Sequence, residues 1–175
     1  MQEEIQLTPT SYVVLGLIDA AGEATPYALK QMVGAAVGAF FSIPHSQVYA
    51  EPERLARHGY LNEQREETGR RRKHYSLTDK GREALRAWVE TPTADLYELR
   101  DPGLLKLAFG SDPAKLAAVQ LETHNHRLKE LEDLLTRLEV AGVPKNTLHL
   151  VEAGIGHERE YLRFWSRLAA EDSRR

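Results

Sequence analysis

Hydrophobic residues recur every three or four positions in three short stretches near the start of the chain, and this spacing predicts three amphipathic helices. Thr8-Pro9 and Thr25-Pro26 are typical of a helix N-cap followed by the first helical residue. Gly22 is expected to end the first helix, and Ser46 is expected to cap the third. The residues predicted to face the core are Val14, Leu17, Ile18 and Ala21, then Leu29, Met32, Val33, Ala36 and Val37, then Val48, Pro52 and Leu55.

After the third helix the pattern changes to two short segments, residues 60–66 and 73–77, which bracket Glu67-Thr68-Gly69-Arg70. We expect a two-stranded hairpin in which Tyr75 and Leu77 share one face. A fourth helix is expected to follow, capped by Thr78 and with its inward face formed by Gly81, Ala84, Leu85, Trp88 and Val89. Three helices, a hairpin and a helix are typical of a winged helix-turn-helix domain, which we assign to residues 1–91.

Every later signal is helical, and residues 92–102, which contain Pro92 and Pro102, are predicted to be the junction. A short apolar helix is expected at 104–109. Asp112-Pro113 is expected to cap a long helix whose apolar positions follow a heptad, and Asn146 is expected to start a last helix. The two predicted seams are Ala114, Ala117, Leu121, His124, Leu128, Leu131, Leu135 and Leu138, and Leu148, Val151, Ile155, Glu158, Leu162, Trp165 and Ala169.

The predicted fold is therefore mainly α with a small β-hairpin wing, and residues 92–175 form a helical, coiled-coil-like domain for dimerisation and possible effector binding. The heptad seam is compatible with packing inside one chain and with packing across a dimer. His124 and Glu158 interrupt the seams at similar heights if the two long helices are antiparallel. A His–Glu contact and a solvated edge are both compatible with that placement.

The composition and the motifs of the sequence exclude several classes of function. The 175 residues include no cysteine, which excludes disulfides and cysteine-bound zinc, and the acidic start, Met1-Gln2-Glu3-Glu4, lacks the apolar region of a signal peptide. No apolar stretch is long enough to span a membrane, so we expect a cytoplasmic protein. The sequence has no phosphate-binding loop, dinucleotide fingerprint or nucleophile elbow. The spacing of its seven histidines does not suit a metal site. We therefore expect no enzyme, metal or cofactor.

The net charge of −3 places any DNA contact at a local site rather than over a basic face. The candidates are the start of the third helix, which suits the major groove, and the basic hairpin tip, which suits backbone phosphates. They comprise His45, Ser46, Gln47, Tyr49, Arg54, Arg70, Arg71, Arg72 and Lys73. An ordinary surface helix and a solvated charge run, or a nuclear-localisation signal, remain alternatives, and Glu51 and Glu53 would repel phosphates.

The same region resembles the PadR family of transcriptional regulators. The shared motifs include hydrophobic-Tyr at 48–49, Arg-Leu-x-x-x-Gly at 54–59 and Tyr-x-Leu-Thr-x-x-Gly at 75–81. The resemblance continues through residues 101–109, 152–155 and Trp165, so it covers roughly residues 8 to 169. It implies a homodimer that usually represses transcription and, in some members, responds to small aromatic ligands. Pro52 stands where the family usually has an apolar residue, commonly leucine, and is expected to bend or fray the third helix.

The sequence thus predicts a DNA-binding repressor that reads an inverted-repeat operator as a homodimer, because one recognition helix covers only a few base pairs. A small aromatic effector is expected to release it. Trp88, Phe109 and Trp165 are the candidate effector-binding residues, with plain core filling as the alternative. A winged-helix module that binds protein instead of DNA is the competing prediction.

Overall fold

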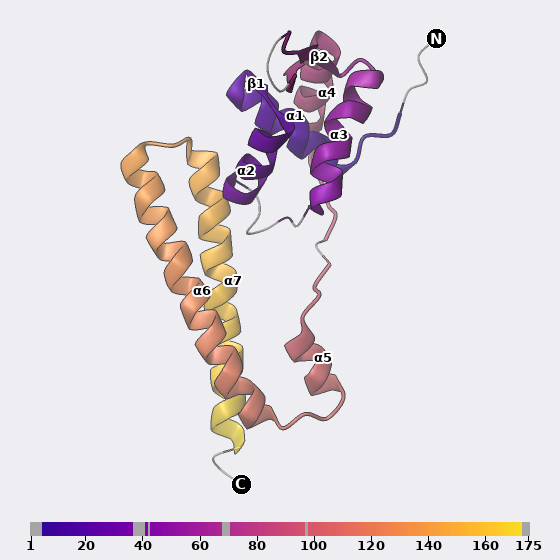
Figure 1. The fold of residues 1–175 in the computed structure, drawn as a ribbon. Helices are drawn as coiled ribbons and strands as arrows, with labels where there is room; N and C mark the ends of the chain where they lie inside the picture. The colour runs from indigo at the N-terminus through magenta and orange to yellow at the C-terminus, as the bar shows by residue number, and fades with distance from the viewer. Residues whose placement is uncertain (1–4, 37–40, 42, 68–70, 97, 173–175) are drawn as a thin grey trace. The chain divides into compact units, whose positions relative to one another are not determined.

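The computed structural model describes residues 5–36, 41, 43–67, 71–96 and 98–172. They form seven helices and three short strands, in two compact units, Met1–Asp95 and Leu96–Arg175 (Figure 1). The elements are α1 (Pro9–Ala21), β1 (Glu23–Ala24), α2 (Pro26–Ala36), α3 (His45–Arg57), β2 (Leu61–Arg65), β3 (Lys73–Leu77), α4 (Asp79–Glu90), α5 (Pro102–Ala108), α6 (Pro113–Ala141) and α7 (Lys145–Asp172). The predicted mainly helical fold with a small wing is confirmed.

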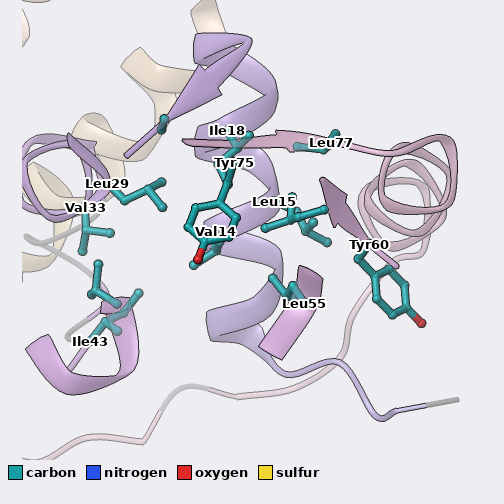
Figure 2. Close-up of a cluster of buried hydrophobic side chains, with 13 residues drawn as sticks. Val14, Leu15, Ile18, Leu29, Val33, Ile43, Leu55, Tyr60, Tyr75 and Leu77 are labelled. Carbon is teal, nitrogen blue, oxygen red and sulfur yellow. The ribbon is translucent and has the colours of Figure 1, made fainter. Parts of the chain in front are cut away.

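The first unit is built around α1, which contacts α2, α3, α4 and the sheet. Val14, Leu15 and Ile18 on this helix are completely buried. The Tyr75 side chain extends from β3 towards α1 within the same cluster (Figure 2). Thr8 caps α1 through a reciprocal pair of hydrogen bonds with Ser11, as its position before Pro9 predicts. Burial of this apolar face is the main term that holds the unit together.

The sheet has three strands in the order β1-β3-β2, all antiparallel. The predicted hairpin is present as β2 and β3, but the prediction missed a third strand at its edge. The additional strand, β1, comprises only Glu23 and Ala24, which pair with Ser76 and Tyr75. Two residues are too few to show an alternating pattern, and their partners lie far along the chain. No local signal identifies such a strand.

The start of α3 also differs from the prediction. Pro44, not Ser46, occupies the N-cap position, and no side chain caps the helix there. Ser46 lies in the first turn and is exposed. The helix continues without a break through Pro52, whose ring is buried beside Val48 and Leu55 on the inner face. The predicted core face of this helix is therefore confirmed.

A tight junction connects the wing to α4. The Thr78 hydroxyl donates to the carbonyls of Gly59 and Tyr60, at 2.7 and 3.0 Å, and accepts from the amide of Gly81. A Cβ on Gly81 would lie 2.2 Å from the Tyr60 carbonyl oxygen, so only glycine fits at this position. Further along α4, Trp88 is 48% and Val89 is 68% exposed, which contradicts their expected inward positions.

The second unit contains an antiparallel pair, α6 and α7, which run side by side (Figure 1). Every predicted seam position on these two helices is buried or half-buried, with Ala117, Leu131, Val151, Ile155 and Trp165 the most buried. Asp101 and Asp112 cap α5 and α6, each by accepting from two backbone amides. Among the described helices, none is both long and apolar enough to cross a membrane.

The two polar residues that interrupt the seams, His124 and Glu158, contact each other. His124 Nδ1 lies 2.5 Å from a carboxylate oxygen of Glu158, and the two side chains are only 15% and 12% exposed. The solvated-edge alternative is therefore wrong. Both side chains are shielded from water and depend on each other for a polar partner. The pair therefore favours one register of α6 against α7.

We predict that the His124–Glu158 pair contributes a measurable coupling free energy. A double-mutant cycle with His124→Ala and Glu158→Ala, followed by urea unfolding at one protein concentration, should give a coupling of about 1–2 kcal/mol. The exposed pair His149–Glu152 on α7 is the matched control and should give far less, since solvent screens it. Equal coupling in the two pairs would contradict the assigned role in register.

Candidate nucleic-acid interface

The first turns of α3 present polar side chains to solvent. His45, Ser46, Gln47 and Tyr49 are all exposed, because the opposite face of the helix is anchored in the core. The side-chain oxygen of Gln47 accepts from the Thr10 hydroxyl at 3.4 Å, and this bond does not use the two N–H donors of the amide. An α-helix fits the major groove, and donors and acceptors near its N-terminus are the groups that reach base edges.

Arg54 lies in a different environment from these exposed residues. Its guanidinium donates to both carboxylate oxygens of Glu51, at 2.6 and 2.9 Å, and to the Ser11 hydroxyl at 3.1 Å. Burial raises the pKa of Glu51, but hydrogen bonds from Arg54 and Ser11 outweigh that effect and hold this pKa below its usual value. The Arg54 charge is thus committed within the protein, as is the charge of Glu51.

The second acid on α3, Glu53, is more exposed than Glu51 and has a cation nearby. Lys73 Nζ, at the start of β3, lies 3.5 Å from Glu53 and 3.2 Å from Glu63 on β2. Glu63 also accepts from Tyr75 Oη and from Arg65 Nε, each at 3.0 Å. Burial raises the pKa of Glu63, but these donors outweigh it and the pKa is lowered. Lys73 therefore ties the wing to α3.

The wing tip carries the remaining predicted cations. Arg71 and Arg72 are exposed, and no salt bridge involves either guanidinium within the described residues. The backbone of Arg72 pairs with Glu66 across the turn, and Arg71 adopts a positive φ of 48°. Arg70 lies outside the described residues. Two charged side chains beside the start of β3 are thus exposed to solvent.

A groove of about 540 Å³ runs between the start of α2, α3 and the wing. It brings together the residues Thr25, Pro26, Tyr27, Tyr49, Arg72 and Lys73. Two tyrosine side chains, 66% exposed at Tyr27 and 44% at Tyr49, therefore border the same groove as a wing arginine. The sequence prediction missed Tyr27. Its position directly after Thr25-Pro26, at an exposed helix start, is the signal that could have identified it.

The residues predicted to bind an effector have three different environments. In the first unit, Trp88 is 48% exposed and stacks on Tyr12, with ring centroids 4.6 Å apart. In the second unit, Phe109 is 84% exposed and Trp165 is completely buried. The indole N–H of Trp165 has no hydrogen-bond partner among the described residues. A buried donor without a partner is costly.

No group of three or more metal-binding side chains occurs within the part of the chain that the structure describes. The polar clusters near α3 and the wing instead pair acids with cations. Glu51 pairs with Arg54 and Glu63 pairs with Lys73, whereas Arg71 and Arg72 face solvent.

Comparison with known proteins shows which family the domain containing α3 and the wing resembles. The sequence model of the transcriptional regulator PadR-like family matches residues 14–87, which include α3 and the wing. The chain carries a domain of this family of transcriptional regulators. The family predicted from the motifs around α3 and the wing is confirmed.

The similarity to PadR proteins extends beyond the matched domain. The negative transcriptional regulator PadR of Bacillus subtilis strain 168 is 27% identical over 140 residues, 76% of each chain. The structure of B. subtilis PadR with operator DNA matches with a TM-score of 0.82 over 95% of this chain and 99% of that chain, at 22% identity. Its complex with p-coumaric acid matches at 0.77, with the same coverage and 24% identity. These solved structures show that the PadR fold is shared.

We predict that the lowered pKa of Glu63 makes the PadR-like domain sensitive to acid. A carboxylate with a lowered folded-state pKa stabilises the fold above its unfolded value of about 4.3, and this contribution is lost as the pH falls through the folded pKa. Glu63→Gln should therefore flatten the decline in urea midpoint from about pH 6 to about pH 3. Glu83→Gln, an exposed acid on α4, is the control and should leave the decline unchanged. A Glu63→Gln profile parallel to wild type would refute the role of these contacts.

Proposed function

We propose that the chain is a transcriptional repressor that binds double-stranded operator DNA as a homodimer, through the start of α3 and the tip of the wing. The observation that carries the proposal is the paired exposure of the α3 first turn and of Arg71 and Arg72, in a domain of a regulator family. As a repressor bound to DNA, the protein acts in the cytoplasm and performs no catalysis.

The internal ion pairs refine the predicted set of contacts. Gln47 and Ser46 are proposed to reach base edges, with His45 and Tyr49 beside them, because all four are exposed on one end of α3. Arg71 and Arg72 are proposed to bind the neighbouring phosphates, together with Arg70. Arg54 and Lys73 are proposed to act mainly by holding α3 and the wing in place, since both are paired with glutamates.

The neighbouring groove supplies a second proposed contact with the backbone. The phenol groups of Tyr27 and Tyr49 can donate to phosphate oxygens, and Arg72 adds a positive charge on the same groove. Hydroxyl and guanidinium donors position a duplex without reading its sequence. We therefore assign this groove to one DNA strand next to the major groove entered by α3.

The second unit is proposed to dimerise the protein. Two related copies double the contact and read an inverted repeat. Several large apolar side chains on this unit are exposed, as expected of a surface covered by a second copy. They are Leu105, Phe109, Val119, Val140 and Leu150.

Repression and release by an effector are supported by the relatives. The B. subtilis relative is a negative regulator, and its fold has been solved with operator DNA and with p-coumaric acid. We propose that this chain is also released by a small aromatic acid. The acceptor that such a ligand offers would satisfy the buried indole N–H of Trp165.

A protein-interaction module without DNA binding is the second candidate. It is favoured by the net charge of −3 and by the pairing of Lys73 and Arg54 with acids, which leaves few cations for phosphates. The two candidates differ in their response to salt, because only DNA binding releases counterions in proportion to the phosphates contacted.

We predict that neutralising the wing weakens DNA binding and reduces its salt dependence. A duplex selected from a random pool by the wild type serves as the probe, and fluorescence anisotropy gives affinity from about 50 to 200 mM salt. Arg71→Ala with Arg72→Ala should lower the slope of log affinity against log salt by about 2 per protomer.

Arg82→Ala is the control for this experiment, because Arg82 is an exposed cation of the same unit that pairs with Asp79 on α4. It should leave affinity and slope unchanged. A wild-type protein that selects no duplex at the lowest salt would exclude the repressor and favour the interaction module.

We predict that p-coumaric acid, or a related aromatic acid, quenches Trp165 fluorescence at the concentrations that release DNA. The chain has two tryptophans, so Trp88→Phe isolates the Trp165 signal and Trp165→Phe isolates Trp88. Saturable quenching is expected in Trp88→Phe only. By linkage, bound DNA should weaken ligand binding by the same factor as ligand weakens DNA binding. Release of DNA with an unchanged Trp165 signal would exclude this site.

A further inference from the structure

Ser11 is the one fully buried polar residue in the described core of the first unit, and it lies on α1, on the side towards α3. Its hydroxyl donates to Glu51 at 2.6 Å and accepts from the Thr8 amide at 2.8 Å and from Arg54 at 3.1 Å. The Thr8 hydroxyl lies 3.1 Å from the same oxygen, so the one donor and two acceptor sites of this serine hydroxyl are fully used. The local cap of α1 and the ion pair of α3 therefore meet at a single oxygen.

These contacts join two helices that are distant in the sequence. Glu51 lies one helical turn after Gln47, which contacts Thr10, the residue before Ser11. Two consecutive residues of α1 thus bind two residues of α3 that share one face. The hydrophobic face of α3 also holds it in the core, but apolar packing is non-directional and fixes a helix rotation less sharply than hydrogen bonds do.

We propose that Ser11, Glu51 and Arg54, the Ser11 cluster, set the rotation of α3 and so determine sequence specificity without contacting DNA. The inference rests on the proposed DNA binding. A rotation of α3 by about 10° moves a side-chain tip by about 1 Å, given a helix radius near 5–6 Å with side chains. Hydrogen bonds to base edges do not tolerate an error of about 1 Å. The Ser11 cluster therefore acts as a set of positioning residues.

The cluster also has an electrostatic consequence. Glu51 holds Arg54 by two hydrogen bonds, so this cation is withheld from the phosphates. A free Arg54 would add a contact that is the same for every sequence and would raise non-specific affinity. Holding the arginine inside the protein therefore favours discrimination over total affinity.

Three variants test the Ser11 cluster in the full-length protein. Each is measured with the selected duplex and with a shuffled duplex across the same salt range, and urea unfolding confirms that each is folded. Ser11→Ala keeps every charge, so its salt slope should equal that of wild type while the ratio of specific to non-specific affinity falls about tenfold, the effect of about 1.4 kcal/mol. Glu51→Gln releases Arg54, so its slope should steepen by about 0.9 and its ratio should fall.

The double variant Glu51→Gln with Arg54→Gln has the net charge of wild type and separates positioning from phosphate contact. If Arg54 does not touch DNA, the slope stays at the wild-type value and only the ratio falls. If Arg54 binds a phosphate, the slope falls by about 0.9 and the proposal is overturned. This variant replaces both charged groups with amides, so it also answers the question should Ser11→Ala fail to fold.

Glu83→Gln is the matched control for loss of an acid, since Glu83 is exposed on α4 of the same unit. Its affinity ratio should equal that of wild type. An unchanged ratio in folded Ser11→Ala and in the double variant overturns the Ser11 cluster alone, because wild-type binding remains. Absence of specific binding by wild type instead overturns the proposed function itself.

Discussion

The pairing of carboxylates on α3 is the interaction on which the proposed DNA surface depends. A helix that approaches a polyanion cannot leave two acids unpaired near it without repulsion. Glu51 is held by Arg54 and Ser11, and Glu53 is held by Lys73. Each pairing also joins α3 to another element, α1 in one case and the wing in the other. Charge compensation and mechanical support are therefore provided by the same contacts.

The sequence predicts the elements well wherever the governing chemistry is local. Thr8 and Thr78 cap helices at the expected positions, and the heptad seam of α6 and α7 lies inward throughout. Ser46 does not cap α3, because Pro44 occupies the position before the helix. The strand β1 could not be predicted, since its pairing with β3 comes from residues about fifty positions away. Local patterns do not contain that information.

The same distinction explains what could be predicted of the candidate site. Exposure of Gln47 and Arg72 follows from the helix face and from the hairpin turn, both of which are local. The pairing of Arg54 is only partly local, because Glu51 is three residues away but the third contact, Ser11, is forty-three residues away on another helix. Composition identifies the cations of a site, but only the folded arrangement identifies which of them are already neutralised. For this reason a net charge of −3 is compatible with a localised anion-binding surface.

The strand order has a consequence for self-association. With β3 in the centre, β2 has one edge without a neighbouring strand in the described sheet, and that strand reads Leu61, Asn62, Glu63, Gln64 and Arg65. Polar and charged side chains on a short edge discourage intermolecular sheet extension and aggregation. The opposite edge, β1, is only two residues long and offers little template for a foreign strand. The wing can therefore remain exposed at high local concentration, as two copies brought together on one duplex would require, without nucleating fibrils.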